Sequence, residues 1–180
     1  MPSIPCTARR FRGRPWPGEA VPVSGRMVRA AAPAVRRGLR VWTRLTRSVT
    51  LGVRVLVLAG DDRVFLVRHG YVDGWHLPGG AVDVGESAAD AAVRELAEEG
   101  NITAEAAPEL AGLYLNAGLG RDHVALYVLR RFRIAGPPRL GREIAAAGFF
   151  PVASPPPGTT PATLRRIDEV IGGTPPAALW

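Results

Sequence analysis

The sequence predicts an α/β fold with a mixed or antiparallel sheet, because two kinds of hydrophobic pattern follow one another along the chain. Residues 50–59 (TLGVRVLVLA) and 63–68 (RVFLVR) are short, apolar and rich in β-branched side chains, as in buried strands. Gly60, Asp61 and Asp62 between them favour a tight turn, so the two strands should form a hairpin. Residues 87–99 carry apolar side chains at helical spacing and predict a helix.

Three later segments have the strand pattern and are separated by Gly, Pro and Asn, which favour turns. They are residues 110–116, 123–133 and 148–152. A second helix is predicted at residues 161–171, because Thr160 is a good N-cap, Pro161 suits the first helical position and Gly172 follows the end. We therefore expect one domain over residues 50–172 and a tail at residues 173–180.

The net charge of +7 belongs to the N-terminal part of the chain. Residues 1–50 contain eleven Arg and one Glu, a charge of +10, so the other 130 residues carry −3. Every basic residue is Arg, and the chain is rich in Ala, Gly and Pro, which indicates a GC-rich coding bias. The high charge is therefore weak evidence for nucleic-acid binding.

Two segments are predicted before the domain. Residues 1–26 mix Pro, Arg and Gly without a period and are expected to be disordered, and Met27 is an alternative start. Residues 27–49 are expected to form an amphipathic Arg-rich helix. Its apolar side could bind an anionic membrane surface and its Arg residues an RNA backbone, but packing against the domain is the favoured interpretation. An Arg-rich leader also resembles an organelle transit peptide, although an upstream extension is the simpler account.

Composition also limits the compartment and the kind of site. Cys6 is the only cysteine, so neither an intramolecular disulfide nor a multi-Cys metal site can form within the chain. No apolar run is long enough for a membrane span. These observations predict a cytoplasmic protein.

The helix predicted at residues 87–99 concentrates carboxylates on one face. Ser87 is the expected N-cap, and Glu95, Glu98 and Glu99 then lie within about 100° of one another. The like charges repel unless a cation lies among them, and oxygen ligands suit Mg²⁺ or Mn²⁺. The small side chains expected to share this face are Ala88 and Ala91, and those expected to face the core are Ala89, Ala92, Val93 and Leu96. Three Glu alone would more often be a solvated surface.

A longer motif favours the metal site. Gly80, Glu86, the run 94–99 (RELAEE) and Ile102 resemble the Nudix box at its full spacing, and the resemblance covers about residues 50–155. The sequence departs from the box at Asn101, where the family has Gly, but Asn tolerates the left-handed conformation that ends a helix.

The resemblance implies an α/β/α sandwich and a pyrophosphohydrolase that uses Mg²⁺ or Mn²⁺. The metal ligands implied are Glu95, Glu98, Glu99, Glu86 and the Gly79 carbonyl. The catalytic residues implied are Glu95, Glu98 and Arg94, which would orient a neighbouring Glu. Outside the box, Glu143 and Asp122 are alternative bases, although a structural role is the favoured interpretation for each, and His76 and His123 are also expected to be structural.

The substrate expected is a nucleoside diphosphate linked to another moiety, such as a nucleotide, an ADP-ribose-like group or a sugar. An RNA 5′-end pyrophosphohydrolase that uses the Arg-rich arm and a non-catalytic nucleotide-sensing module are the alternatives. Nucleic-acid binding is not favoured. The sequence leaves the oligomeric state open, with a homodimer as one possibility.

Overall fold

The computed structural model describes residues 49–60, 62–118 and 122–180. The arm predicted for residues 1–26, and all but the last residue of the helix predicted for residues 27–49, lie outside the described residues.

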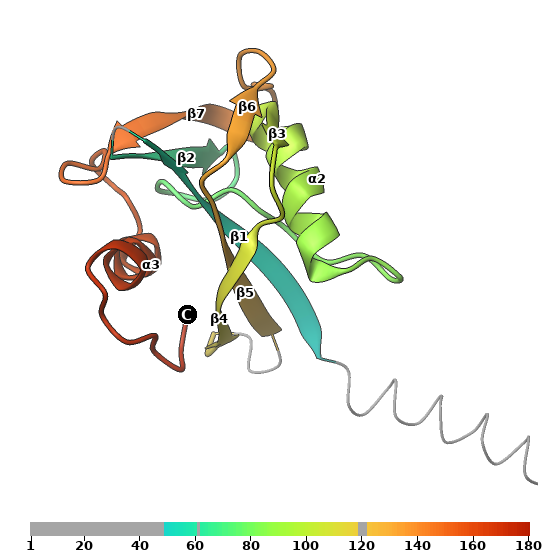
Figure 1. Ribbon diagram of the computed structural model, residues 1–180, viewed down its shortest axis with the longest axis vertical. Coiled ribbons are helices and arrows are strands. Elements are labelled where there is room, and N and C mark those ends of the chain that lie inside the picture. The colour runs from blue at the N-terminus through green and yellow to red at the C-terminus, as the bar shows by residue number, and fades with distance from the viewer. Residues whose placement is uncertain (1–48, 61, 119–121) are drawn as a thin grey trace, which may run out of the picture. The chain divides into compact units, whose positions relative to one another are not determined.

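A mixed five-stranded sheet forms the centre of the domain (Figure 1). In spatial order its strands are β4 Glu109–Asn116, β5 Asp122–Leu129, β1 Thr50–Ala59, β2 Arg63–His69 and β7 Ile144–Pro151. β1 is antiparallel to β2 and parallel to β5, so the predicted hairpin is confirmed and the sheet is mixed.

A second sheet holds two short strands. β3 Ile102–Ala104 pairs antiparallel with β6 Phe132–Ile134. The single strand predicted for residues 123–133 is therefore wrong, since the chain leaves the large sheet after β5 and then pairs with β3. β3 was not predicted, because three residues are too few to show a period.

Both predicted helices are present and begin at the predicted caps. α2 spans Ala88–Gly100, where the Ser87 hydroxyl accepts a hydrogen bond from the first turn at 3.1 Å. α3 spans Pro161–Ile171 and is capped by Thr160. At the end of α2, Asn101 has φ 53° and ψ 37°, so it occupies the left-handed position usually held by Gly.

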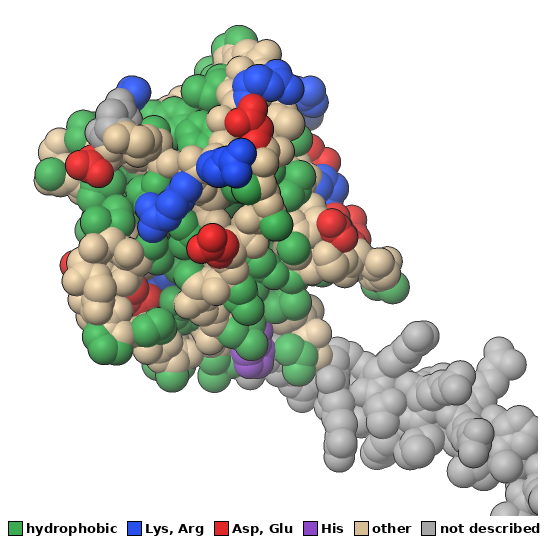
Figure 2. Space-filling view, in the orientation of Figure 1, with side chains coloured by type: hydrophobic (Ala, Val, Ile, Leu, Met, Phe, Trp, Pro, Cys, Tyr) green, Lys and Arg blue, Asp and Glu red, His purple; other side chains and the backbone are tan. Residues whose placement is uncertain are grey.

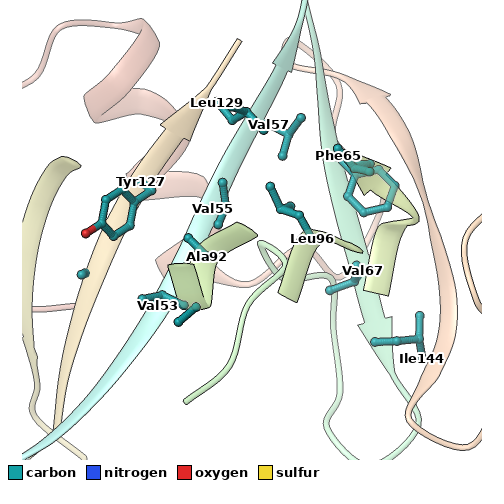
Figure 3. Packing of buried hydrophobic residues seen from close by; sticks show 13 residues of the cluster. Val53, Val55, Val57, Phe65, Val67, Ala92, Leu96, Tyr127, Leu129 and Ile144 are labelled. Carbon is teal, nitrogen blue, oxygen red and sulfur yellow. The ribbon is translucent and has the colours of Figure 1, made fainter. Parts of the chain in front are cut away.

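The helices cover opposite faces of the sheet, and alternate residues of β1 pack against each. Val53 contributes to the core cluster that includes Leu96 of α2 (Figure 3), whereas Leu56 contributes to the cluster that includes Ile167 of α3. The α/β/α sandwich is therefore confirmed.

The buried stripe of α2 is rotated from the predicted one. Ala92 and Leu96 face the core as expected, but Val93 is 36% exposed, so its predicted place in the core is wrong. Ala91 and Glu99, predicted on a carboxylate face away from the core, are buried. Ala91 belongs to the core cluster that includes Val53, and Glu99 is held by the loop before α2 through the Gly79 N–H.

The last residues of the chain lie along β4. Leu115 accepts a hydrogen bond from the Trp180 backbone N–H and donates to the Ala178 carbonyl, both at 3.0 Å. The segment predicted as a tail, residues 173–180, thus extends the edge of the sheet. Within the described residues, no helix has the length and apolar character needed to cross a membrane.

Candidate active site

A loop of residues 76–80, which we call the wedge loop, fills a gap in the sheet. β1 and β2 pair directly only next to their hairpin. Further along, Val67 of β2 exchanges backbone hydrogen bonds of 2.8 and 2.9 Å with His76, and the Val53 N–H of β1 donates to the Gly80 carbonyl at 2.8 Å. The wedge loop therefore joins the two strands where they have separated.

Two glycines allow the wedge loop to fit. Gly79 has φ 138°, and a Cβ there would overlap the backbone carbonyl of Val53. A Cβ on Gly80 would overlap the carboxylate of Glu95 instead. Gly79 is thus required by the backbone, whereas Gly80 leaves room for a site side chain.

Arg94 brings together three of the predicted carboxylates. Its guanidinium forms a two-point ion pair with Glu86, at 2.9 and 3.1 Å. The Nη1 atom donates to Glu95 at 2.7 Å and to Glu98 at 3.4 Å, and Nη2 donates to the Ala81 carbonyl at 3.0 Å. These contacts lower the pKa of Glu86 and raise that of Arg94, so both groups stay charged. In this arrangement one guanidinium contacts the carboxylates of Glu86, Glu95 and Glu98.

Glu99 is the buried member of the carboxylate group, with 6% of its surface exposed. The backbone N–H of Gly79 donates to its Oε2 at 2.8 Å. Burial raises the pKa of Glu99 to about 7, although this hydrogen bond and the charge of Arg54 favour the ionised form. The side chain therefore titrates near neutral pH in the absence of a cation.

Arg54, on β1, was not predicted as a site residue. Its guanidinium donates to the carbonyls of Leu77 and Gly79, at 2.9 and 2.7 Å, and interacts electrostatically with Glu99 and Glu95. Burial lowers the pKa of Arg54. The available signal was one charged residue within an otherwise apolar strand.

His69, at the end of β2, was also missed. Its ring is buried, and neither nitrogen has a hydrogen-bond partner in the described part of the chain. Nδ1 lies 4.0 Å from Glu99 Oε1. Burial and then the charge of Arg54 lower the pKa of His69, so the ring is neutral near pH 7. It lines a cleft of about 430 Å³ with Arg68 and Trp75.

The remaining predicted residues lie around this centre. Glu143 is exposed, yet its charge contributes to the raised pKa of Glu99. Asp122 accepts hydrogen bonds from Thr50 and Asn116, on the sheet surface away from α2. His76 is held by the Asp73 carbonyl at 3.0 Å. Neither Asp122 nor His76 contacts the carboxylates of α2 in any of these interactions.

The donor set fits a hard divalent cation in its chemistry. Among the described residues, no three His, Cys, Asp or Glu side chains already converge as a metal site, and Arg94 binds between Glu95 and Glu98. However, the possible metal ligands on α2 are all carboxylate oxygens, which hard divalent cations prefer. Burial also disfavours the ionised form of Glu99 unless a cation is bound beside it. The Gly79 carbonyl oxygen accepts one hydrogen bond from Arg54 and keeps a second lone pair that could bind a cation. The positive charge of Arg54 opposes a cation at that oxygen.

The fold and the motif have relatives among known proteins. A MutT NUDIX hydrolase from Burkholderia pseudomallei is 27% identical, with a TM-score of 0.59 over 68% of this chain and 98% of that one. An ADP-ribose pyrophosphatase from Streptococcus suis 89-1591 is 25% identical, with a TM-score of 0.51 over 68% of this chain and 92% of that one.

Another relative matches a shorter part of the chain with higher sequence identity. A Bacillus subtilis (strain 168) protein named "Putative 8-oxo-dGTP diphosphatase" is 52% identical over 50 residues, which are 28% of this chain and 34% of that protein. The matched part thus spans about a third of that relative. The model of the NUDIX domain matches residues 49–169, more than half of the sequence, and the chain belongs to this family.

Proposed function

We propose that this chain is a divalent-metal-dependent pyrophosphohydrolase acting on a nucleoside diphosphate linked to another moiety. The observation that carries the proposal is the Arg94 centre, in which one guanidinium binds Glu86, Glu95 and Glu98 beside the glycines of the wedge loop. Membership of the NUDIX family and the activities for which the relatives are named support it.

Mg²⁺ or Mn²⁺ is the proposed cofactor, in keeping with the metal dependence typical of the family. Glu95, Glu98 and Glu99 are the proposed ligands, with Glu86 and the Gly79 carbonyl as further oxygen donors. A bound ion would lower the pKa of a coordinated water and offset charge on the phosphate oxygens. Glu95 or Glu98 is the proposed acceptor of the proton of the attacking water.

The protein's own groups set up this chemistry. Arg94 holds Glu95 and Glu98 on one side of the helix, so that their rotamers are restricted before substrate binds. The Gly79 N–H fixes Glu99 and favours its charged form, which a cation requires. Water attacks one phosphorus of the diphosphate, the bond to the bridging oxygen breaks, and that oxygen leaves on the other phosphate.

The substrate panel should include nucleoside triphosphates, ADP-ribose, dinucleoside polyphosphates, sugar nucleotides and triphosphorylated RNA. Each is incubated with Mg²⁺ or Mn²⁺, and the released products are quantified. Glu98→Gln is the test variant, because this side chain is 58% exposed and contributes little to the fold. Glu109→Gln, an exposed carboxylate on β4, is the matched control.

We expect metal-dependent turnover that falls by about a hundredfold or more in Glu98→Gln and stays unchanged in Glu109→Gln. Turnover that Glu98→Gln leaves intact would contradict the proposed site. Metal-dependent binding of substrate without any turnover would instead support the sensing module.

The RNA alternative depends mainly on the Arg-rich residues outside the described part. On the face shown in Figure 2, basic and acidic side chains are interspersed among hydrophobic ones. Hydrolysis of triphosphorylated RNA in the panel, lost after residues 1–47 are removed, would support that alternative.

A further inference from the structure

Asn101 stands where the family has Gly, and its side chain makes a contact that Gly cannot make. The amide Nδ2 donates to the Pro137 carbonyl at 3.3 Å, and the Asn101 carbonyl accepts from the Ala135 N–H at 2.9 Å. The backbone N–H of Asn101 is bonded to the Leu96 carbonyl and so ends α2. Residue 101 therefore connects the end of the carboxylate helix to residues 135–143 between β6 and β7, which we call the return loop (Figure 1).

The return loop approaches the Asn101 amide closely because residue 136 is Gly. A Cβ on Gly136 would lie 2.8 Å from Asn101 Nδ2, a distance at which one of the two groups would have to move. The carbonyl that accepts from this amide belongs to the next residue, Pro137. A side chain at residue 136 would therefore displace the amide from its acceptor.

Backbone hydrogen bonds order the rest of the return loop. The Leu140 N–H donates to the Pro138 carbonyl at 3.1 Å, and the Gly141 N–H donates to the Ile144 carbonyl at 2.9 Å. Pro137 and Pro138 also restrict the backbone, because the proline ring fixes φ. A constraint at the start of the loop therefore also limits where its end lies.

The end of the return loop lies beside the buried carboxylate of the site. The Glu143 carbonyl accepts from the Gly70 N–H at 2.9 Å, and the following Ile144 pairs with His69 of β2. His69 Nδ1 is 4.0 Å from Glu99 Oε1. The charge of Glu143 acts on Glu99 and contributes to its raised pKa. The loop that begins at the end of α2 thus brings Glu143 back to the proposed metal site.

The Glu143 carboxylate depends on this backbone for its position. Within the described residues, neither a hydrogen bond nor an ion pair holds the carboxylate. The pairing of β2 with β7 also shifts register between Arg68 and His69, next to this segment. A bulge of this kind changes the direction in which neighbouring side chains point. Movement of the return loop would therefore move the charge of Glu143 relative to Glu99.

We propose that Asn101 is a positioning residue, whose amide holds the return loop against α2 and thereby keeps the Glu143 carboxylate beside the proposed metal ligands. A negative charge near a cation site increases the affinity of that site for the cation. Gly at residue 101 would also end the helix, but it would leave out the bond to Pro137. The inference rests on the proposed function, because it concerns the metal site of the same centre.

Two substitutions remove this contact from opposite sides. Asn101→Gly deletes the amide and keeps a residue suited to the left-handed helix end, and Gly136→Ala pushes the amide away from the loop. Gly141→Ala, in open space within the same loop, is the matched control. In hydrogen exchange on the metal-free full chain, the Ala135 and Leu140 amides should exchange about three- to tenfold faster in the first two variants only.

Mg²⁺ affinity shows whether the contact acts through Glu143. Calorimetric titration with MgCl₂ should give an affinity about three- to tenfold lower for Glu143→Gln, and an affinity lowered by a similar or smaller factor for Asn101→Gly. In the double variant, Asn101→Gly should add nothing to the loss caused by Glu143→Gln. A residue that only caps the helix would not produce this non-additivity.

Two results would overturn the inference. One is an equal loss of Mg²⁺ affinity from Asn101→Gly in the wild-type and Glu143→Gln backgrounds. The other is unchanged exchange of the return loop in Asn101→Gly.

The two proposals fail in different ways. A non-additive loss of Mg²⁺ affinity, in a protein that hydrolyses no member of the panel, would support the positioning role and contradict the hydrolase. Turnover that depends on Glu98, with a Mg²⁺ affinity that neither Asn101→Gly nor Glu143→Gln changes, would support the hydrolase and overturn the positioning role. Absence of Mg²⁺ binding by the wild-type protein would contradict both.

Discussion

The backbone N–H of Gly79 donates a 2.8 Å hydrogen bond to the buried carboxylate of Glu99. This hydrogen bond connects the wedge loop to α2. Glu99, a proposed metal ligand, therefore also fixes the position of the loop beside it. The packing of the wedge loop and the proposed metal binding therefore both involve this one side chain.

The first prediction concerns the stability of the metal-free protein. Because the pKa of Glu99 is raised to about 7, its stabilising contribution is complete below its ordinary value of 4.5 and is lost as the pH rises through 7. The free energy of unfolding should fall by up to about 3 kcal/mol over this interval, relative to Glu99→Gln. Urea unfolding in EDTA at several pH values measures the difference. Parallel pH profiles of the two proteins would contradict the prediction.

The same group should control Mg²⁺ affinity in the opposite direction. A cation requires the ionised carboxylate, so affinity should rise with pH through about 7 and then level off. Glu99→Gln should bind Mg²⁺ weakly and lose this pH dependence. Calorimetric titration at pH 6 to 8 tests the point, and a flat wild-type profile would exclude Glu99 as the titrating ligand.

Arg94→Lys should separate positioning from charge. Lys cannot form the two-point ion pair with Glu86 while also contacting Glu95, so the carboxylates lose their fixed rotamers. We expect kcat to fall by about ten- to a hundredfold, with little change in thermal stability. Arg133→Lys, on the exposed strand β6, is the matched control. Equal kcat in the two variants would show that Arg94 acts only as a charge.

The two glycines of the wedge loop should respond differently to alanine. Gly79→Ala places a Cβ on the Val53 backbone at positive φ, so it should destabilise the domain by about 3 kcal/mol or more. Gly80→Ala meets the flexible Glu95 side chain, so it should lower kcat with a smaller loss of stability. Gly60→Ala, in open space, is the control. Thermal unfolding and kcat on the same samples distinguish the two effects.

Removal of the Arg54 guanidinium should shift the titration of Glu99. Its positive charge favours the ionised carboxylate, and Arg54→Leu also leaves two buried carbonyls without a donor. The pH at which Mg²⁺ affinity is half-maximal should therefore rise, and the domain should lose about 2 kcal/mol of stability. Arg54→Lys keeps the charge and should shift the midpoint less. An unchanged midpoint in Arg54→Leu would exclude the electrostatic coupling.

The sequence predicted those parts of the fold that local signals determine. The hairpin of β1 and β2 and the caps Ser87 and Thr160 depend on neighbouring residues, so they were confirmed. β3 was missed because a three-residue strand is defined by its partner β6, which lies far along the chain.

The candidate site shows the same division. The spacing of Glu95, Glu98 and Glu99 correctly placed them on one helix. A helical wheel gives only the angles between side chains, and it does not show which side of the helix is covered by the rest of the protein. The wedge loop covers the side of Glu99, and only the tertiary structure reveals it. Arg54 lies more than twenty residues from the carbonyls that it binds, so no local pattern could identify its partners.

The wedge loop has a consequence for cooperativity. Since it completes the hydrogen bonding of Val53 on β1 and Val67 on β2, residues that serve the site also supply the inner ladder of the sheet. The amide protons of these valines can exchange with solvent only when the loop detaches, and detachment exposes the middle of the sheet. Opening of the wedge loop is therefore expected to weaken the sheet at the same time, because both use the same backbone hydrogen bonds.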